Sequence, residues 1–137
     1  MRAAKILIVE DDEDQQRILS DTLRFRNYEV VQARDGLEAM QRIEEDLPDL
    51  IVLDVRLPHI DGFSLAEILK KDPKTARIPV LAVTLYDIDI RQRISAPWDS
   101  LRMKPLPPDE LIAEVERLLK GVVAEDANGS DGPLPAS

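Results

Sequence analysis

Short apolar runs alternate along the chain with segments in which apolar residues recur every three or four positions. The apolar runs predict strands at residues 5–9, 28–33, 50–53, 78–83 and 101–103. The periodic segments predict helices at residues 14–26, 36–46, 63–71 and 109–120, and a short, weak helix at 87–95. Strands that alternate with helices favour a parallel sheet with helices on both faces, joined by right-handed crossovers.

Each of the four clearer helices carries an apolar stripe that we expect to cover the sheet. The stripes consist of Ile18, Leu19, Leu23 and Phe25; of Leu37, Met40, Ile43 and Leu47; of Phe63, Leu65, Ile68 and Leu69; and of Leu111, Ile112, Val115, Leu118 and Leu119. Trp98 is expected to pack in the core or under a helix rather than to form a binding surface.

The chain of 137 residues suits a single domain, which we place at residues 1–121. Gly121 follows the last periodic segment and is a candidate to cap that helix. Residues 122–137 contain small, acidic, proline and glycine residues without an apolar period, so we predict a disordered tail there.

The charge of the chain narrows the classes of function. Acidic residues number 27 and basic residues 18, for a net charge of −9, which argues against direct nucleic-acid or membrane binding. There is no cysteine, which excludes disulfides and thiolate metal sites. No apolar stretch approaches the roughly 20 residues that a membrane-spanning helix needs. The expected location is the cytoplasm.

Polar residues stand where the predicted strands end. The first strand leads into Glu10 and Asp11, the third ends at Asp54, the fourth at Thr84 and the fifth at Lys104. In an open parallel sheet, ligands bind beyond the carboxyl ends of the strands. We therefore expect one edge of the sheet to gather carboxylates, a hydroxyl and an ammonium group.

This set of groups is suited to phosphoryl transfer. Carboxylates crowded in one cleft repel each other unless a cation joins them, and oxygen ligands alone favour Mg²⁺. An ammonium and a hydroxyl group could meet the remaining phosphoryl oxygens. A carboxylate can itself be the nucleophile and form an aspartyl phosphate. Asp12 is instead expected to cap the first helix, and Asp61-Gly62 to form a turn.

The chain resembles bacterial response-regulator receiver domains, the group that includes the chemotaxis receiver. The matching segments, which together cover about residues 4–120, are KILIVEDDEDQ, DLIVLDVRLPHIDG, IPVLAVT and KP, in this order. The resemblance implies a flavodoxin-like, doubly wound fold of five βα units. Its five-stranded parallel sheet would have the order 2-1-3-4-5, with helices on both faces.

The resemblance also implies a role for each site residue, with Mg²⁺ as the cofactor. Asp54 would be the phosphoacceptor and a metal ligand. Glu10 and Asp11 would be the acid pair at the metal, with Asp11 the more direct ligand. The other three are Arg56, a metal ligand through its backbone carbonyl, and Thr84 and Lys104, which would bind phosphoryl oxygens. Lys104-Pro105 resembles the cis peptide of the family.

The function implied is a phosphoacceptor switch of a two-component system, not a conventional enzyme, that catalyses its own phosphorylation and dephosphorylation. A histidine kinase or a histidine phosphotransfer protein would be the donor. A downstream protein, or a second copy of the chain in a homodimer, would read the signal.

Two alternatives come from other classes. One is a pseudo-receiver that binds partners without phosphorylation, and the complete set of site residues argues against it. The other is a metal-dependent hydrolase with an aspartyl nucleophile. Such hydrolases usually have a second acid two positions beyond the nucleophile, where this chain has Arg56.

The segment between Thr84 and Lys104 departs from the family pattern and looks shorter than usual. Leu85 replaces a small residue, and Leu101 replaces the aromatic residue that usually reports phosphorylation. We therefore expect phosphorylation to change the backbone of residues 84–100 more than the rotamer of Leu101. We also expect a partner or second copy to bind there, with Trp98 as a reporter.

Overall fold

The computed structural model of the chain describes residues 3–57, 60–85 and 97–128. The elements in these ranges follow in the order β1 (Lys5–Val9), α1 (Glu13–Phe25), β2 (Glu29–Ala33), α2 (Gly36–Glu45), β3 (Leu50–Asp54), α3 (Gly62–Lys71), β4 (Val80–Thr84), β5 (Ser100–Met103) and α5 (Pro108–Asn128). The helix predicted at residues 87–95 lies outside the described residues.

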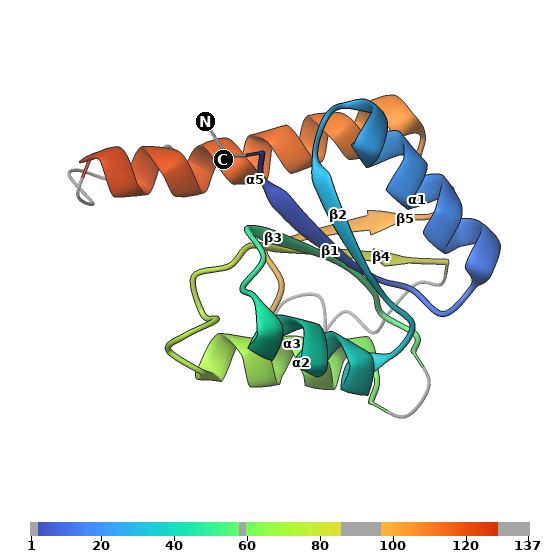
Figure 1. The fold of residues 1–137 in the computed structure, drawn as a ribbon, viewed down its shortest axis with the longest axis horizontal. Helices are drawn as coiled ribbons and strands as arrows, with labels where there is room; N and C mark the ends of the chain where they lie inside the picture. The colour runs from blue at the N-terminus through green and yellow to red at the C-terminus, as the bar shows by residue number, and fades with distance from the viewer. Residues whose placement is uncertain (1–2, 58–59, 86–96, 129–137) are drawn as a thin grey trace.

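All strand pairs in the sheet are parallel, and the strand order is β2-β1-β3-β4-β5. Helices α1 and α5 cover one face and α2 and α3 cover the other (Figure 1). The predicted flavodoxin-like fold, with its parallel sheet in the order 2-1-3-4-5, is confirmed. None of the helices in the described residues is both long and apolar enough to cross a bilayer.

The core consists of two clusters, one on each face of the sheet. Every residue of β1, β3 and β4 is buried, because helices cover both faces of these central strands. Alternate residues point to opposite faces, so Leu7 packs towards α2 and α3 while Ile8 packs towards α1 and α5. Trp98 is partly buried and packs against the first cluster, as predicted, and its ring centroid lies 5.7 Å from that of Phe63 with the two rings perpendicular.

The stripe predicted for α1 is only half right. Leu19 and Leu23 are buried, but Ile18 is 52% and Phe25 85% exposed. Residues four apart lie on one face of a helix, whereas Phe25 comes two positions after Leu23 and lies about 200° around the axis. Three other predicted stripe residues, each also more than two-fifths exposed, are Leu37, Leu47 and Ile68.

The predicted end of the last helix at Lys120 is wrong, and Gly121 is not its cap. Helix α5 continues through Gly121 to Asn128 and extends past the edge of the sheet in Figure 1. One glycine inside a helix costs only about 1 kcal/mol, which does not suffice to end it. The tail predicted to be disordered from residue 122 is therefore helical as far as Asn128. Residues 129–137 lie outside the described residues, and the domain boundary at residue 121 stays a prediction.

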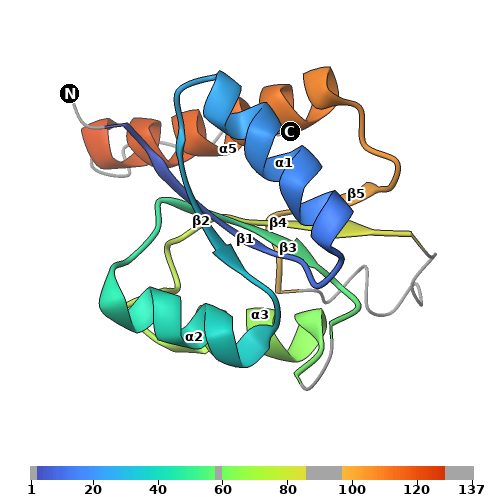
Figure 2. The same cartoon turned by 45° about the vertical axis from the view of Figure 1, so that its right-hand side comes forward.

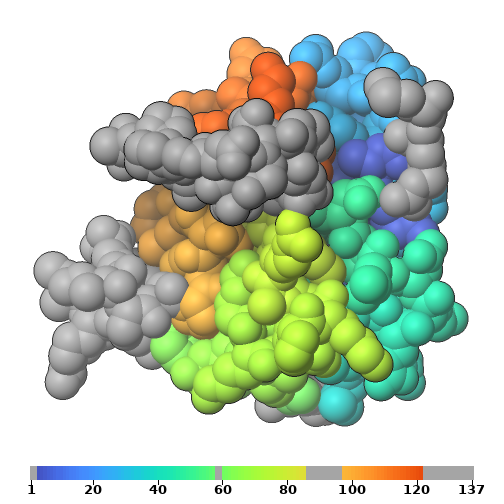
Figure 3. All heavy atoms as spheres, turned by 90° about the vertical axis from the view of Figure 1, so that its left-hand side faces the viewer, coloured from blue at the N-terminus to red at the C-terminus, as the bar shows by residue number. Residues whose placement is uncertain are grey.

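The carboxyl ends of the strands lie at one edge of the sheet, which comes forward in Figure 2. Figure 3 looks onto the opposite end, where the yellow-green segment leading from α3 into β4 lies beside the teal end of α2. Strand-end residues far apart in the sequence therefore meet at one place.

A buried carboxylate, Glu114, joins α5 to β5. It accepts hydrogen bonds from the Ser100 hydroxyl, from Arg102 at 3.1 Å and from Arg117 at 2.6 and 2.9 Å. The bonds from Arg117 are the main reason that the pKa of Glu114 falls from 4.5 to about 2; burial opposes this, and Ser100 and Arg102 add to it. The ionised form is therefore more stable in the folded chain than in the unfolded one.

We expect Glu114→Gln to destabilise the fold at neutral pH by on the order of 2 kcal/mol, because charge-assisted hydrogen bonds are lost. Since the folded pKa is depressed, this contribution is complete above pH 4.5 and disappears as the pH falls towards 2. Urea denaturation from pH 7 to pH 3 should show the two proteins converging at low pH. Glu116→Gln is the control, because Glu116 is half-exposed and lies 3.8 Å from Arg26; an equal effect there would contradict the prediction.

Candidate functional site

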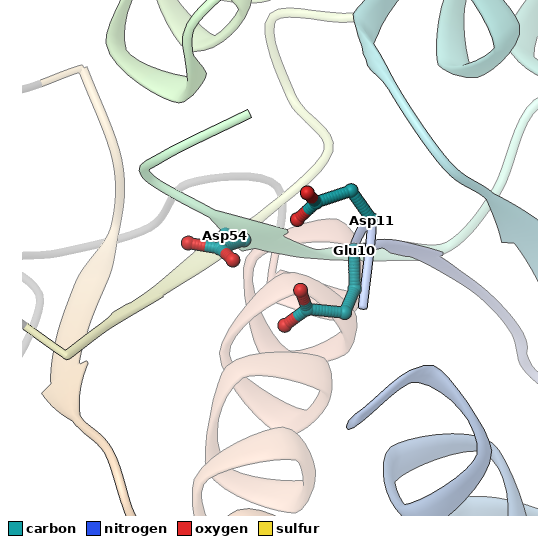
Figure 4. Close-up of side chains that lie close together, drawn as sticks. All are labelled: Glu10, Asp11 and Asp54. Atoms are coloured by element: carbon teal, nitrogen blue, oxygen red, sulfur yellow. The ribbon is translucent and has the colours of Figure 1, made fainter. Parts of the chain in front are cut away.

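Three carboxylates meet at the ends of the two central strands β1 and β3. Glu10 and Asp11 directly follow β1, and Asp54 is the last residue of β3. Val9 pairs with Leu53 across the two strands, so the residues that follow them are neighbours. One carboxylate oxygen from each acid lies within 4.8 Å of the others, and the three side chains lie close together in Figure 4.

Lys104, which directly follows the edge strand β5, completes this cluster. Its backbone N–H donates to the Thr84 carbonyl at 2.7 Å, which ties the residue after β5 to the end of β4. Its Nζ donates to Glu10 Oε1 at 2.5 Å and to Asp54 Oδ2 at 3.3 Å. The peptide bond between Lys104 and Pro105 is cis, as the resemblance to receiver domains implied.

Two further predicted residues lie next to Asp54 in different ways. The backbone N–H of Arg56 donates to Asp54 Oδ1 at 2.9 Å, while the Arg56 residue itself is exposed. Thr84 is 1% exposed at the end of the neighbouring strand β4, where Asp54 pairs with Val83. The predicted set of six residues thus occupies one edge of the sheet.

The electrostatics of the cluster reflect its burial. Burial is the main cause that raises the pKa of Glu10 from 4.5 to about 7; the hydrogen bond from Lys104 opposes this and the charge of Asp54 adds to it. Burial lowers the pKa of Lys104, but its hydrogen bond to Glu10 and the charge of Asp54 outweigh burial and hold it above 10.5. Three carboxylates facing one ammonium leave an excess of negative charge.

These residues fit a magnesium ion. All the side-chain donors in the cluster are oxygens, which Mg²⁺ prefers, and one or two carboxylates usually suffice for it. Because one carboxylate oxygen of each of the three acids lies within 4.8 Å of the others, Glu10, Asp11 and Asp54 could hold such an ion together.

Two further acids cap helices: Asp12 does so as predicted, whereas Asp61 does so in place of the turn predicted at Asp61-Gly62. Asp12 is the N-cap of α1 and accepts from the Gln15 N–H at 2.9 Å. Asp61 is the N-cap of α3 and accepts from the Ser64 N–H at 2.8 Å. Neither belongs to the group of carboxylates that could share a metal ion in the described residues.

Sequence reasoning missed the reason for a glycine at position 62. The Gly62 N–H donates to the Val55 carbonyl at 2.8 Å, so α3 begins directly against the end of β3. A Cβ at this position would lie 2.5 Å from the Asp54 carbonyl oxygen and 2.6 Å from Val55 Cα. The Asp-Gly pair suggested only a turn, and no local pattern reveals such a long-range approach.

A model of the response regulator receiver domain family matches residues 6–116. The chain belongs to this family. Receiver domains of response regulators receive phosphoryl groups from histidine kinases, and the family generally binds Mg²⁺ at an acidic pocket. In this receiver domain, Glu10, Asp11 and Asp54 form a cluster of acidic residues at the carboxyl ends of β1 and β3.

Relatives and solved structures agree with this assignment. Response regulator PleD of Caulobacter vibrioides is 38% identical over 120 residues, which are 86% of this chain and 26% of that protein. The DNA-binding dual master transcriptional regulator RpaA of Synechocystis is 38% identical over 118 residues, which are 85% of this chain and 49% of that protein. The receiver domain thus spans between about a quarter and a half of these curated relatives.

Among solved structures, a putative response regulator from Chloroflexus aurantiacus superposes with a TM-score of 0.82 at 34% identity, covering 87% of this chain and 99% of that one. A CheY-like receiver domain protein from Methanospirillum hungatei superposes with a TM-score of 0.84 at 28% identity, covering 90% of this chain and 99% of that one. The receiver-domain family and its fold are therefore shown by sequence and structure alike.

Proposed function

We propose that this receiver domain is a phosphoacceptor switch that takes a phosphoryl group onto Asp54 from a histidine kinase or a histidine phosphotransfer protein. The observation that carries the proposal is that Asp54 lies between two carboxylates and an ammonium group. Two other carboxylates offer oxygens within 4.8 Å of its own, and the Lys104 ammonium lies 3.3 Å from its Oδ2.

The acid pair is the centre of the proposed metal site. Asp11 would be the more direct ligand, assisted by Glu10, and Asp54 and the backbone carbonyl of Arg56 would be the protein's other ligands. When bound there, Mg²⁺ supplies positive charge that neutralises the phosphoryl oxygens during transfer. The exposure of Asp11 leaves this side open for the ion and the donor.

Asp54 is the proposed nucleophile. Its carboxylate oxygen forms a bond to phosphorus as the bond from phosphorus to the donor's imidazole nitrogen breaks, and the electron pair of that bond leaves with the imidazole. The Arg56 N–H holds Oδ1 at 2.9 Å, and Lys104 lies beside Oδ2. The carboxylate is thus held from both ends before the donor arrives.

Lys104 and Thr84 would bind the arriving phosphoryl group. Lys104 now shares its ammonium between Glu10 and Asp54, and it would turn to a phosphoryl oxygen once one is present. We propose that the Thr84 hydroxyl donates to another phosphoryl oxygen, which would couple phosphorylation to the loop after β4.

The signal would leave through contacts with a downstream protein or a second copy of the chain. RpaA is named as DNA-binding, but this chain spans only 49% of that relative and carries a net charge of −9. We therefore propose no direct contact of this receiver domain with nucleic acid.

The test is Mg²⁺-dependent labelling by acetyl phosphate, followed by intact mass spectrometry. The wild-type protein should gain one phosphoryl group with Mg²⁺ and none with EDTA, and Asp54→Asn should gain none. Asp12→Asn is the control, because asparagine caps a helix as well as aspartate does, so this variant should label normally. Labelling of Asp54→Asn at the wild-type level would refute the assignment, and an unlabelled wild type would favour a binding module without phosphorylation.

A further inference from the structure

Gln16 places a buried amide directly beneath the loop that carries the acid pair. It lies in α1 and is 7% exposed. Its Nε2 lies 3.1 Å from the carbonyl oxygens of Ile8 and Ala33 and 3.3 Å from that of Glu10. One side chain thus joins the end of β1, the end of β2 and the first residue of the loop.

The opposite side of this amide is fixed as well. The Ser20 hydroxyl donates to Gln16 Oε1 at 3.0 Å, and it accepts from Gln32 Nε2 at 2.9 Å. Because only carbonyls surround Nε2 and a hydroxyl donor meets Oε1, the amide has a single sensible orientation. The network of Gln16, Ser20 and Gln32 is therefore fully connected from α1 to β2.

The carbonyl of Glu10 belongs to the peptide that joins Glu10 to Asp11. Around it, the Glu10 N–H donates to the Ala33 carbonyl at 3.0 Å, and the Asp12 N–H donates to Glu10 Oε2 at 3.2 Å. The Gln16 side chain donates to the oxygen of this peptide. It therefore fixes the orientation of the peptide, and with it the direction in which the Asp11 side chain points.

We infer that Gln16 is a positioning residue for the acid pair and that it sets the affinity of the site for Mg²⁺. This inference rests on the proposed function. If the Gln16 amide only stabilised the fold through its buried hydrogen bonds, replacing it would change the stability of the fold and nothing else. A positioning amide changes metal affinity even in a protein that remains folded, as groups that orient metal ligands do.

The test compares Gln16→Met with the wild type in the full chain. Methionine keeps the length of the side chain but removes its donor and acceptor. The dissociation constant for Mg²⁺, measured by calorimetry, should rise about 10-fold to 100-fold. In the metal-free protein, the backbone amide signals of Asp11 and Asp12 should shift in nitrogen–proton NMR spectra. Labelling by acetyl phosphate should be slow at low Mg²⁺ and recover at saturating Mg²⁺.

Thr75→Ala is the matched control for lost stability. Thr75 is buried and donates to the Leu69 carbonyl at 2.6 Å, in the connection between α3 and β4 at the other end of the sheet. The Thr75→Ala protein should be less stable than the wild type but bind Mg²⁺ with the same affinity. Ser20→Ala is the milder variant, which keeps the donors of Gln16 but frees its Oε1, and its affinity should fall between those of wild type and Gln16→Met.

A Mg²⁺ dissociation constant of Gln16→Met within about twofold of wild type would overturn the inference while leaving the proposed function intact. If Gln16→Met does not fold, an unchanged affinity in Ser20→Ala overturns it. Failure of the wild-type protein itself to bind Mg²⁺ or to take a phosphoryl group would instead refute the proposed function, and this inference with it.

Discussion

Replacing Lys104 with methionine should destabilise the metal-free protein by up to about 3–5 kcal/mol, because it leaves the buried Asp54 carboxylate without its cation. Glu10, whose pKa is already about 7, takes up a proton instead. The Lys104 side chain is 9% exposed, and its Nζ bonds both Glu10 and Asp54. The same change should increase the affinity for Mg²⁺, since the ion no longer shares these carboxylates with an ammonium group. Urea denaturation with EDTA and with Mg²⁺ should therefore show more stabilisation by Mg²⁺ in the variant than in the wild type.

Lys104 has two roles, one in stability and one in phosphoryl transfer, and the rate of phosphorylation tests the second. The variant should bind Mg²⁺ yet react with acetyl phosphate about 100-fold more slowly, because a donor to the phosphoryl oxygens is lost. Lys70→Met is the control: Lys70 bonds Asp99 Oδ2 at 2.9 Å and two backbone carbonyls away from the site. It should lose stability equally with and without Mg²⁺, and wild-type labelling by Lys104→Met would contradict the role assigned to Lys104.

Gly62→Ala should destabilise the fold by about 1–3 kcal/mol or more, since it forces overlap in a close-packed region. The added Cβ would lie 2.5 Å from the Asp54 carbonyl oxygen and 2.6 Å from Val55 Cα. Both are backbone atoms, so no side-chain rotation relieves the clash. Because one of them belongs to the phosphoacceptor, labelling by acetyl phosphate should slow as well.

Gly121→Ala is the opposite case and the natural control. Gly121 stands inside α5, and apart from its chain neighbours and the backbone of its own helix no atom lies within 4 Å of a Cβ built there. Alanine should therefore stabilise the protein by about 0.5–1 kcal/mol, through the higher helix propensity of alanine. Thermal unfolding and labelling of both variants would check the pair, and a Gly62→Ala protein as stable and as reactive as wild type would contradict the predicted close approach.

The predictable part of this molecule is its sheet and the edge that carries the site. Strands buried on both faces appear as continuous apolar runs, such as Leu50–Leu53, and the polar residue that ends each run marks the sheet edge. The parallel arrangement then brings Asp54 and Lys104 together, although 50 residues separate them in the chain. This part depends on local pattern and on general topology.

The parts that could not be predicted depend on tertiary contacts. The apolar spacing of α1 did not reveal that Phe25 is exposed, because the sequence does not show which side of the helix meets the sheet. Gly121 looked like a cap, yet the helix passes through it. The contacts of Gln16 with three carbonyls from two strands and a loop likewise have no signature in the sequence.

The position of the phosphoryl group is the most direct test of Asp54 as the phosphoacceptor. After labelling with acetyl phosphate and Mg²⁺, hydroxylamine converts an acyl phosphate to a hydroxamate, which peptide mass spectrometry can assign to a single residue. We expect a hydroxamate at Asp54, present with Mg²⁺ and absent with EDTA. A hydroxamate at Glu10, Asp11 or another acid, or none in a protein that has gained a phosphoryl group, would contradict it.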